Sequence, residues 1–527
     1  MGKFILRILA KFACVQNLFK RDYILLVDNL FNNDAELVDN YALFEYLQTI
    51  DKYKNKSFYI VNKNNVQYEE IKNKYKNIIS VDKTKINFAL IKCLFKTKYW
   101  LDSFQVINQF NVNLKEYIKK SNIIPIYMQH GINYFKSGFL MSPYAKQIGD
   151  KVFKKIVFSS KKERNLFKEF YGYNDKNTIL AGLSRWDTIL NKPSGLDGNK
   201  TIFVYFTHRA YFHHPEIKIE LTRYYQNIIS FLNSNKLKEL LKNYNITLKL
   251  GLHHEVARYC DFTIPNIEII EDKDIGEIKQ QAAMLITDFS SMCFDFMFND
   301  KPIAFYRIDA NDSLFAIDSE GRINNENVES KNGELYNICY DAESIINIIE
   351  KYCKNNFQLE EEYKQINNTF FTYRKDIRKH LIENILSSPE NIPNGCAQIP
   401  SKTVEYNKLY NCREIIPFAF YGAFLSQKRG RQINEIETKI WFKTNEYKKA
   451  ILDIELNTSF NKRFKWEEIE VFLNKKFITN YTVPEGMLSI NIPIDNFANE
   501  IQEVHLVYKN KKRINMCIKS LMLREVC

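Results

Sequence analysis

Short apolar runs alternate with amphipathic stretches along the first three quarters of the chain, and each run has the length of a buried strand. Strands that alternate with helical stretches are typical of a mainly parallel sheet. The pattern therefore predicts two α/β units, at residues 25–195 and 196–390. The runs are YILLVDN, SFYIVN, KYWLDS, IPIYMQH and KIVFSS in the first unit, and TIFVYFTH, TLKLGLH, IEIIED, MLITD and PIAFY in the second.

The pattern changes after the second unit. A loop with one proline and two glycines, residues 191–200, separates the two units, and a proline-rich segment at 387–401 follows the second. From residue 401 onward, strand-like runs recur at near-regular spacing, which predicts a small all-β sandwich over 401–527. These runs are TKIWFK, KAILDIEL, EIEVFL, GMLSINI, EVHLVY and INMCIKSLML.

Residues 1–24 predict an amphipathic helix. Its separation of apolar and basic residues is typical of a helix that lies on a membrane surface, and packing against the chain's own domain is the alternative. Basic residues interrupt the apolar positions, so the segment is not expected to be a signal peptide. No run of 18 apolar residues occurs, so no membrane-spanning helix is expected. The apolar face comprises Phe4, Ile5, Ile8, Phe12, Val15 and Phe19, and the basic face comprises Lys3, Arg7 and Lys11.

Composition excludes several classes of protein. Hydrophobic residues make up 45% of the 527 residues and aromatic residues 14%, which indicates several folded cores rather than disorder. The formal charge of +13 is spread without a compact Lys/Arg block, so a nucleic-acid-binding module is the least expected class. A basic balance suits a nucleotide phosphate, an anionic lipid or a polyanionic substrate, and equally a solvated surface. The ten cysteines contain no C-x-x-C pair, which argues against a disulfide framework or metal cluster and favours a reducing cytosol.

Histidines mark the ends of three predicted strands. His130 follows the run IPIYM and precedes Gly131, which allows a sharp turn. His208 and Arg209 follow TIFVYF, and His253 ends TLKLGLH. Open α/β sheets present their chemistry at the carboxyl ends of strands, and histidine transfers protons readily near neutral pH. We therefore expect these residues to be candidates for catalysis, with a satisfied structural histidine as the alternative for each.

A polar loop interrupts the apolar stretch LITDFSSMCFDF, residues 285–296. A strand, a short polar loop and a helix can bind an anion through backbone N–H groups at the helix N-terminus, and Ser290 and Ser291 add hydroxyl donors. The alternative is that Asp288 or Ser290 only caps the helix. Asp295 lies among apolar residues, where an unpaired carboxylate is costly, so we expect it to bond to nearby backbone or to an arginine.

Two further acidic motifs each have two interpretations. In GLSRWD, Arg185 offers a bidentate fork for phosphate and Asp187 could hold that arginine, but an interdomain turn with a structural ion pair explains the motif equally well. Asp272 and Asp274 form a D-x-D pattern that would suit a metal-bound sugar nucleotide. Their position before IGEIKQQAA favours helix capping instead. No P-loop, G-x-G-x-x-G or G-x-S-x-G motif occurs.

Taken together, the motifs resemble one known family. YMQHG, GLSRWD, YFTHR, LGLHH and LITDFSSMCFDFMFNDKP occur in the order seen in CDP-glycerol glycerophosphotransferases, the teichoic-acid primases and polymerases and their capsule-building relatives. The resemblance covers roughly residues 85–310. It implies a GT-B fold with two Rossmann-like domains facing a cleft, the acceptor domain at 25–195 and the nucleotide-donor domain at 196–390. The implied reaction moves a polyol phosphate from CDP-glycerol or CDP-ribitol to a hydroxyl of a growing teichoic-acid-like or capsular polymer and releases CMP.

The resemblance also implies roles for individual residues. His130 matches the histidine proposed as the base on the acceptor hydroxyl, and His253 matches a second essential histidine near the donor phosphates. Arg209, Ser290 and Ser291 match donor-binding positions, and we expect the neighbouring Asp288, His208 and His254 to lie at the donor phosphates too. We expect Gly131, Arg185, Asp187 and Lys136 to support the cleft.

The chain departs from the family pattern at several positions. His208 stands where the family often has tryptophan. His254 replaces the usual proline, which leaves open which of His253 and His254 is catalytic. Lys136 is only an offset counterpart of the family's lysine. The family's Y…RG segment is not clear after the serine motif, so the polyol, the acceptor and the linkage position stay open.

In-line attack on phosphorus needs a base for the alcohol and positive dipoles around the pyrophosphate. Histidine, arginine and a helix N-terminus can supply these, so we expect no cofactor and no metal site, although a divalent metal remains open. The expected partners are the CDP-polyol, an anionic polyol-phosphate or glycan acceptor, free or lipid-linked, and the inner membrane surface, where the chain would be peripheral on the cytoplasmic face.

Two other functions fit the same sequence. One is a GT-B glycosyltransferase that uses a sugar nucleotide, and the other is a non-catalytic glycan-binding scaffold. The role of 401–527, whether it holds the polymer, docks or mediates oligomerisation, is also open, as is whether one unit or many are added.

Overall fold

The computed structural model describes residues 20–526 apart from gaps within that range. Residues 1–19 of the predicted N-terminal helix, 1–24, lie outside the described residues. The end of the predicted range is not helical, because Tyr23 belongs to the first strand. In the part of the chain that is described, no helix is long and apolar enough to cross a membrane. The gaps are 31–32, 34–36, 38, 83–86, 110–111, 136–152, 172–174, 191–199, 214–216, 253–255, 258–261, 263, 265–266, 271–273, 310–334, 389–402, 413–417, 422, 427–429, 434–436, 445–447, 458–466, 484–485, 495–501 and 510–515.

Seven parallel strands form the sheet of the first α/β unit, in the order β3-β2-β1-β4-β5-β6-β7. The strand order reverses between β1 and β4, which is the point where open α/β sheets leave a crevice beyond the strands' carboxyl ends. The strands are β1 (Tyr23–Val27), β2 (Ser57–Asn62), β3 (Ile78–Val81), β4 (Thr97–Asp102), β5 (Ile124–Tyr127), β6 (Lys155–Phe158) and β7 (Thr178–Leu180).

The second α/β unit contains a six-stranded parallel sheet in the order β10-β9-β8-β11-β12-β13. Its strand order reverses between β8 and β11. All ten predicted strands of the two units are present, so the expectation of parallel α/β sheets is confirmed. The strands are β8 (Lys200–Phe206), β9 (Ile246–Leu252), β10 (Glu268–Ile270), β11 (Met284–Thr287), β12 (Ile303–Tyr306) and β13 (Ile338–Cys339).

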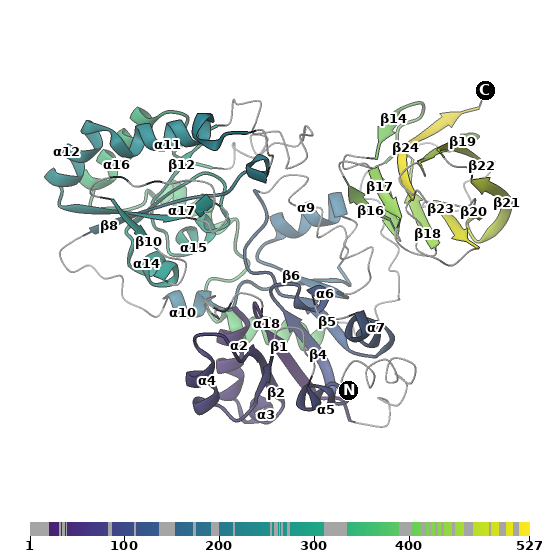
Figure 1. Cartoon of the computed structure of the whole chain (residues 1–527), viewed down its shortest axis with the longest axis horizontal. Coiled ribbons are helices and arrows are strands. Elements are labelled where there is room, and N and C mark those ends of the chain that lie inside the picture. Colours follow the sequence, from purple (N-terminus) through teal and green to yellow (C-terminus); the bar gives the residue numbers. More distant parts are fainter. Residues whose placement is uncertain are drawn as a thin grey trace.

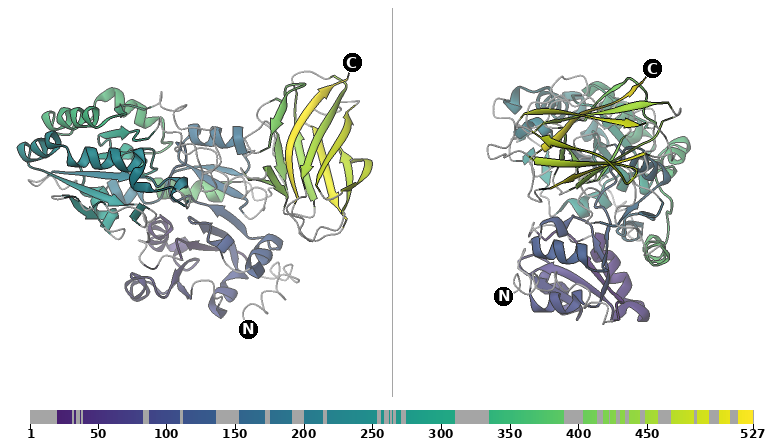
Figure 2. Two further views of the ribbon diagram at one scale, coloured as in Figure 1. Left: turned by 45° about the horizontal axis from the view of Figure 1, so that its top comes forward. Right: turned by 90° about the vertical axis from the view of Figure 1, so that its right-hand side faces the viewer.

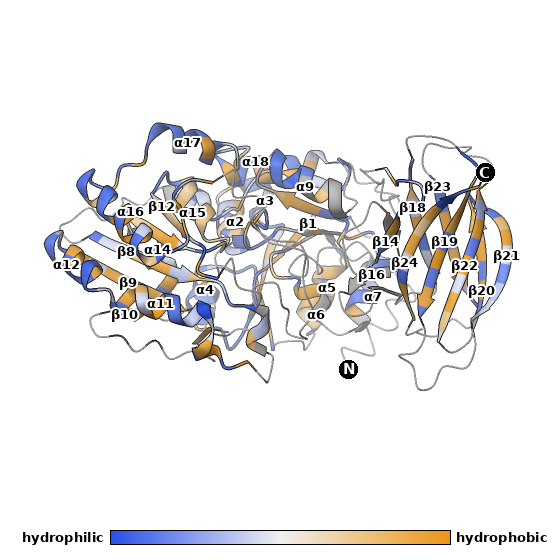
Figure 3. Ribbon diagram, turned by 90° about the horizontal axis from the view of Figure 1, so that it is seen from above, coloured by the Kyte–Doolittle hydropathy of each residue, from blue (hydrophilic) through white to orange (hydrophobic). Residues whose placement is uncertain are grey.

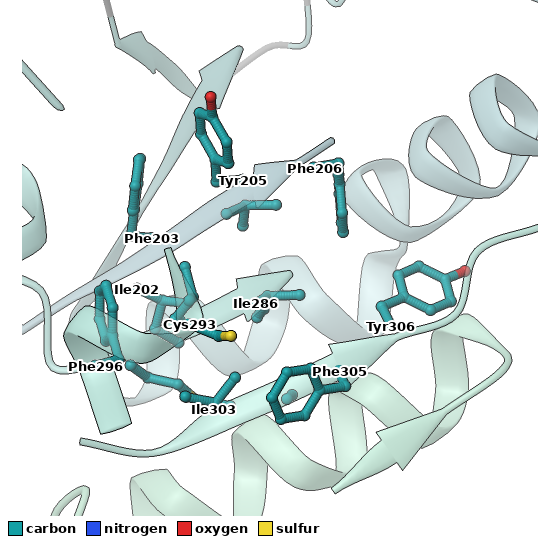
Figure 4. Packing of buried hydrophobic residues seen from close by; sticks show 14 of the residues in the cluster. Ile202, Phe203, Tyr205, Phe206, Ile286, Cys293, Phe296, Ile303, Phe305 and Tyr306 are labelled. Carbon is teal, nitrogen blue, oxygen red and sulfur yellow. The ribbon is translucent and has the colours of Figure 1, made fainter. Parts of the chain in front are cut away.

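Burial on both faces explains why these strands have nearly continuous apolar sequences. In β1, residues 24–27 are all buried, and in β11 the whole strand is buried. Figure 4 shows how Ile202 and Phe203 of β8, Ile286 of β11 and Phe305 of β12 pack into one core with neighbouring helix residues. In Figure 3 the strands of both units are largely hydrophobic, whereas helices such as α12 and α17 are largely hydrophilic.

Helices cover the two sheets, and one of them crosses between the units. α18 belongs by sequence to the predicted range 196–390, but Leu381, Ile382 and Ile385 pack into the core of the first sheet. In space, therefore, the second unit ends before α18 (Figure 1). The helices are α2 (Asp39–Gln48), α3 (Asp51–Lys54), α4 (Tyr68–Lys74), α5 (Phe88–Leu94), α6 (Val106–Gln109), α7 (Val112–Lys120), α9 (Lys161–Tyr171), α10 (Trp186–Leu190), α11 (Arg223–Asn233), α12 (Asn235–Asn243), α14 (Ile275–Gln281), α15 (Cys293–Phe298), α16 (Ala342–Lys354), α17 (Glu361–Asn368) and α18 (Ile377–Ser387), with 3₁₀ turns η2 (Ala210–His213) and η3 (Ile219–Leu221).

The C-terminal part is a β-sandwich, as predicted. Two antiparallel sheets, β16-β17-β24-β19-β22 with β14 on β24, and β15-β18-β23-β20-β21, share one hydrophobic core. The first α/β unit lies between this sandwich and the second α/β unit (Figures 1 and 2). The strands are β14 (Leu409–Asn411), β15 (Ala419–Tyr421), β16 (Ala423–Ser426), β17 (Gly430–Ile433), β18 (Glu437–Phe442), β19 (Ala450–Asn457), β20 (Glu467–Leu473), β21 (Lys476–Val483), β22 (Met487–Ile494), β23 (Gln502–Tyr508) and β24 (Met516–Glu525).

Candidate functional site

Three segments from the two α/β units meet at one place, which we call the junction: residues 129–135 after β5, residues 184–187 at the start of α10, and the serine loop with α15, residues 288–296, after β11. The junction therefore brings together three of the motifs that the sequence singled out. It lies at the carboxyl ends of β5 and β11, where an open α/β sheet presents polar groups.

Gly131 and Ser291 lie against each other in the junction. A Cβ atom added at Gly131 would come within 2.6 Å of Ser291 Oγ, nearer than side-chain atoms can approach without moving. The sequence suggested a glycine here for a sharp turn, and the structure adds a second reason, since a Cβ atom at this position would require the Ser291 side chain to move. The loop that carries His130 therefore touches the loop that carries the serines.

Arg185 links the two units through buried ion pairs. Its Nη1 donates to Asp39 Oδ1 at 2.6 Å in the first unit, and its Nη2 donates to Asp295 Oδ1 at 2.9 Å in the second. Nη1 also donates to the carbonyl oxygen of His130 at 3.2 Å. Of the two interpretations of GLSRWD, this geometry fits the interdomain turn with a structural ion pair, because the guanidinium is already occupied by carboxylates.

Asp295 is held as a carboxylate in this network, which confirms the expectation that it bonds to an arginine. Burial alone would raise its pKa, but Arg185 and Lys279 outweigh burial and lower the pKa to about 2. Trp186 Nε1 also donates to Asp295 Oδ1 at 2.8 Å. For Asp39 the balance is opposite, and burial raises its pKa to about 6 although Arg185 lies against it.

Asp187 also has a structural position. Its Oδ1 accepts the backbone N–H of Ile377 at 3.0 Å and its Oδ2 that of Arg378 at 2.8 Å, which satisfies the N-terminus of α18. The GLSRWD motif thus holds α18 against the first unit through Asp187 and contacts the second unit through Arg185.

His130 is exposed at the junction, while the groups around its ring are mostly buried. Its Nδ1 lies 2.9 Å from the carbonyl oxygen of Ser103, which follows β4, and 3.4 Å from Tyr127 Oη. The imidazole stacks on the ring of Phe104, with 4.4 Å between centroids. The structure thus fixes the ring on one side, an arrangement that a proton-transfer group requires.

Asp288, at the start of the serine loop, is saturated with hydrogen-bond donors. It accepts from Thr207 N at 3.1 Å, Thr207 Oγ1 at 3.0 Å and Phe289 N at 2.7 Å, and Arg209 Nη1 donates to it at 2.7 Å. It is 1% exposed. Its carboxylate therefore fixes the serine loop to the end of β8.

Arg209 lies in the same buried cluster. Beyond Asp288, it donates through Nε and Nη2 to both carboxylate oxygens of Asp309, at 2.8 and 2.7 Å. Its guanidinium carbon lies 4.7 Å from the ring centroid of Tyr224 and 4.8 Å from that of Phe289. A phosphate would have to displace one of these carboxylates to bind it. The prediction that Arg209 binds a donor phosphate thus stays a prediction.

The serine loop keeps donors that no described group uses. Met292 N donates to Ser290 Oγ at 3.3 Å, and the N–H groups of residues 293–295 bond back to residues 290–292. In the described part of the chain, the N–H groups of Ser290 and Ser291 donate to no acceptor. Helix capping by Ser290 accounts for one N–H only, and α15 has just six residues. The loop, rather than a long helix dipole, is what could receive an anion.

Several predicted site residues are not described. His253, His254 and Lys136 lie outside the described residues, and so does Asp272.

Two further residues that the sequence singled out are described. His208 follows β8 and is partly buried beside Arg209. Asp274 directly precedes α14 but makes no capping hydrogen bond with its side chain, so the expectation of helix capping is wrong for this residue.

Other residues that contact the site were not found from the sequence. Asp39 and Asp309 complete the two arginine clusters but lie 146 and 100 residues from their arginines, and no local pattern links them. Asp28 and Ser103 directly follow β1 and β4. The rule that picked out His130, a polar residue at the carboxyl end of a buried strand, applies equally to these two and could have found them.

Comparison with known proteins identifies the family of this chain. The family model described as CDP-Glycerol:Poly(glycerophosphate) glycerophosphotransferase matches residues 9–386. The minor teichoic acid biosynthesis protein GgaB of Bacillus subtilis (strain 168) is 24% identical over 353 residues, which cover 64% of this chain and 37% of GgaB. The teichoic acid ribitol-phosphate polymerase TarK of Staphylococcus aureus (strain NCTC 8325 / PS 47) is 22% identical over 54% of this chain and 59% of TarK. The chain thus spans less than two thirds of either relative.

This chain is also similar to a solved structure of the wall teichoic acid polymerase TagF. The match covers 73% of this chain and 92% of the TagF chain, with 14% sequence identity and a TM-score of 0.48.

Proposed function

This chain belongs to the CDP-glycerol:poly(glycerophosphate) glycerophosphotransferase family, and on that premise we propose that it is a CDP-polyol phosphotransferase. It transfers glycerol phosphate or ribitol phosphate from the CDP-polyol to a hydroxyl of a growing teichoic-acid-like or capsular polymer and releases CMP. The observation that carries this proposal is the contact of Gly131 with Ser291, which puts the exposed His130 next to a loop with unused anion-binding groups.

The two α/β units take the roles of a GT-B enzyme. The first unit binds the acceptor, because it carries His130, and the second binds the CDP-polyol, because it carries the serine loop. The donor lies across the switch point between β8 and β11, where open parallel sheets receive nucleotides. The contacts of Arg185 with both units support this division, since they hold the two candidate half-sites together.

The reaction follows from the chemistry of the junction. His130 takes the proton of the acceptor hydroxyl, whose oxygen attacks the polyol-bearing phosphorus in line. The new O–P bond forms as the P–O bond to CMP breaks, and CMP leaves. The N–H groups of Ser290 and Ser291, which donate to no acceptor among the described residues, bind the phosphate oxygens on which charge accumulates, together with the Ser291 hydroxyl. His253 and His254 follow β9, the neighbour of β8, and supply further donors to the pyrophosphate.

Arg209 and Asp288 take a supporting role in this proposal. Their buried ion pair, together with Asp309, fixes the start of the serine loop against β8. A carboxylate at the phosphate itself would repel it, so we assign Asp288 and Arg209 to the shape of the loop rather than to direct contact with the donor. This revises the roles that the family resemblance implies.

The acceptor is a polyanion at the cytoplasmic face of the membrane. The basic and amphipathic sequence of segment 1–24 supports this location, since a helix with that pattern would bind anionic lipid surfaces. The β-sandwich, with a hydrophobic core of its own, holds the polymer or docks the enzyme. Retention of an isolated 401–527 fragment on the purified polymer tests the first role, and absence of retention discards it.

The test of the proposed function is CMP release by the full chain from CDP-glycerol and, separately, from CDP-ribitol, each with a short polyol-phosphate primer. We expect primer-dependent release that His130→Ala abolishes and that His505→Ala, a matched change in the β-sandwich, leaves unchanged. If neither donor yields CMP but a sugar nucleotide raises the melting temperature, the chain is a glycosyltransferase. Unchanged polymer output with His130→Ala would favour the scaffold instead.

A further inference from the structure

The contact between His130 and Ser103 determines where the imidazole hydrogen lies. Nδ1 is 2.9 Å from the Ser103 carbonyl oxygen, and a carbonyl can only accept a hydrogen bond. Without a hydrogen on Nδ1, two lone pairs would face each other at this distance. The neutral ring therefore carries its hydrogen on Nδ1 and its lone pair on Nε2, since the partner of one ring nitrogen decides the tautomer.

The Ser103 carbonyl is itself held in place by a buried carboxylate. Ser103 Oγ donates to Asp28 Oδ1, and Ser103 N donates to the Val27 carbonyl at 3.3 Å. Ser103 is fully buried and Asp28 is 1% exposed. These residues stand at the ends of the neighbouring strands β4 and β1, where the strand order of the first sheet reverses.

Asp28 is a firm anchor because three further donors hold it. The backbone N–H groups of Asn40 and Tyr41 donate to it at 3.0 and 2.9 Å, and Tyr59 Oη donates at 3.0 Å. Burial raises its pKa, and the bonds from Ser103, Asn40, Tyr41 and Tyr59 act against that rise. Four donors fill the acceptor positions of a carboxylate, so its orientation, and that of the Ser103 hydroxyl, is fixed.

The next residue along the chain supports the same ring. Phe104, on which His130 stacks, donates its N–H to Asp102 Oδ1 at 3.0 Å, and Asp102 also accepts from Val106 N and Ile107 N, each at 2.9 Å. Two buried carboxylates thus fix the short segment 102–104.

We propose that Ser103 is a positioning residue for His130: its carbonyl, held through the bond of its hydroxyl to Asp28, keeps the imidazole hydrogen on Nδ1 and leaves Nε2 to accept the proton of the acceptor hydroxyl. Ser103 does not touch the substrate and acts only through the ring. The catalytic part of this inference rests on the proposed function, whereas the tautomer that it requires can be observed without any reaction.

The first test is the tautomer of His130 in the full chain. Ring-¹⁵N-histidine labelling with two-bond proton–nitrogen correlation, assigned with His130→Gln, distinguishes hydrogen on Nδ1 from hydrogen on Nε2. We expect the Nδ1–H form in the wild-type protein and a mixture of tautomers in Ser103→Ala. An Nε2–H form in the wild-type protein overturns the proposal, whatever the activity is.

The second test compares two hydroxyl deletions around the same carboxylate. Ser103→Ala and Tyr59→Phe each remove one donor to Asp28, but only Ser103 carries the carbonyl that His130 contacts. We expect both variants to lower the melting temperature, and only Ser103→Ala to lower kcat, by about tenfold with KM unchanged, since a misaligned base loses part of its contribution. Equal kcat in the two variants would reduce Ser103 to a structural residue.

The two tests separate this inference from the proposed function. If the wild-type protein shows the Nδ1–H form but releases no CMP from either CDP-polyol, the proposed function fails and the support of His130 stands. If CMP is released but the tautomer is the opposite one, the function stands and the role of Ser103 is refuted.

Discussion

Replacement of Asp295 by asparagine tests whether the buried ion pairs hold the two α/β units together. Asparagine keeps Oδ1, which accepts from Arg185 and Trp186, and replaces Oδ2, which accepts from Lys279 at 3.1 Å, with an amide. The variant therefore keeps the shape and the acceptor of Arg185 and Trp186, but it removes the charge and puts an amide donor opposite Lys279. Breaking one side of a buried ion pair typically costs about 3–5 kcal/mol.

The pKa of Asp295 gives an independent magnitude. The folded state lowers it from 3.8 to about 2, because Arg185 and Lys279 outweigh burial. A shift of this size is worth about 2–3 kcal/mol in favour of the folded carboxylate. We therefore expect Asp295→Asn to lower the free energy of unfolding by about 3 kcal/mol at pH 7, a large part of the stability of an ordinary domain.

The sign of the pH dependence follows from the same shift. A group whose pKa is lower in the folded state stabilises it above the unfolded pKa, so this contribution is full above about pH 5 and is lost as the pH falls toward 2. The difference in the free energy of unfolding between the wild-type protein and Asp295→Asn should therefore decrease as the pH falls from about 5 toward 2. Urea unfolding followed by tryptophan fluorescence at several pH values measures it.

A matched control removes the charge from an exposed pair. Glu361→Gln breaks its ion pair with Lys364, where Glu361 is 76% exposed, and we expect a change below about 1 kcal/mol. A loss below 1 kcal/mol in Asp295→Asn, or a larger loss that stays constant down to pH 3, would contradict the reasoning.

Three further substitutions test the junction. Gly131→Ala should lower kcat at least tenfold by pushing Ser291 away, with the fold intact by circular dichroism; unchanged kcat would show that the two loops need not touch. Arg209→Lys should raise KM for the CDP-polyol and destabilise the fold by about 2–4 kcal/mol, because lysine cannot replace a guanidinium that binds Asp288 and Asp309 together; an unaffected melting temperature would argue against the buried cluster. Ser291→Ala should weaken binding of CDP-glycerol about tenfold in calorimetry while the melting temperature of the apoprotein stays the same, and unchanged binding would remove Ser291 from the donor site.

The sequence was informative where structure follows from local pattern. Long apolar runs predicted β1, β4 and β8 because strands buried on both faces need continuous hydrophobic sequence. Strands as short as β7 and β13, with three and two residues, carry no such pattern and were missed. In the sandwich, β14 to β17 and β21 were missed for a related reason. β14 to β17 have three or four residues each and β21 lies at the edge of its sheet, and such strands lack a clear alternation.

Individual residues of the site could be predicted from the sequence, but the contacts between them could not. His130, Ser290 and Ser291 stand next to strands, so a local rule finds them. The pairing of Arg185 with Asp39 joins residues 146 positions apart, and the return of α18 to the first sheet depends on the packing of the whole molecule. Such contacts follow from tertiary structure, which a single sequence does not display. For that reason the sequence left two roles open for Arg185, phosphate binding and a structural ion pair between the units. Its contacts in the structure favour the structural ion pair.

The geometry of His130 is fixed from two independent directions. Ser103 holds the ring through Nδ1, and Arg185 holds the backbone through the His130 carbonyl while it also pairs with Asp295 of the second unit. The base is therefore coupled to the approach of the two units, because the arginine that joins them also fixes the loop that carries it. If these supports act separately, the losses of kcat in Ser103→Ala and Asp295→Asn should multiply in the double variant. A double variant no slower than the slower single variant would instead mean that Ser103 and Asp295 act through one rigid element, the loop from Gln129 to Gly131. Contact between the two units and orientation of the base would then depend on the same loop.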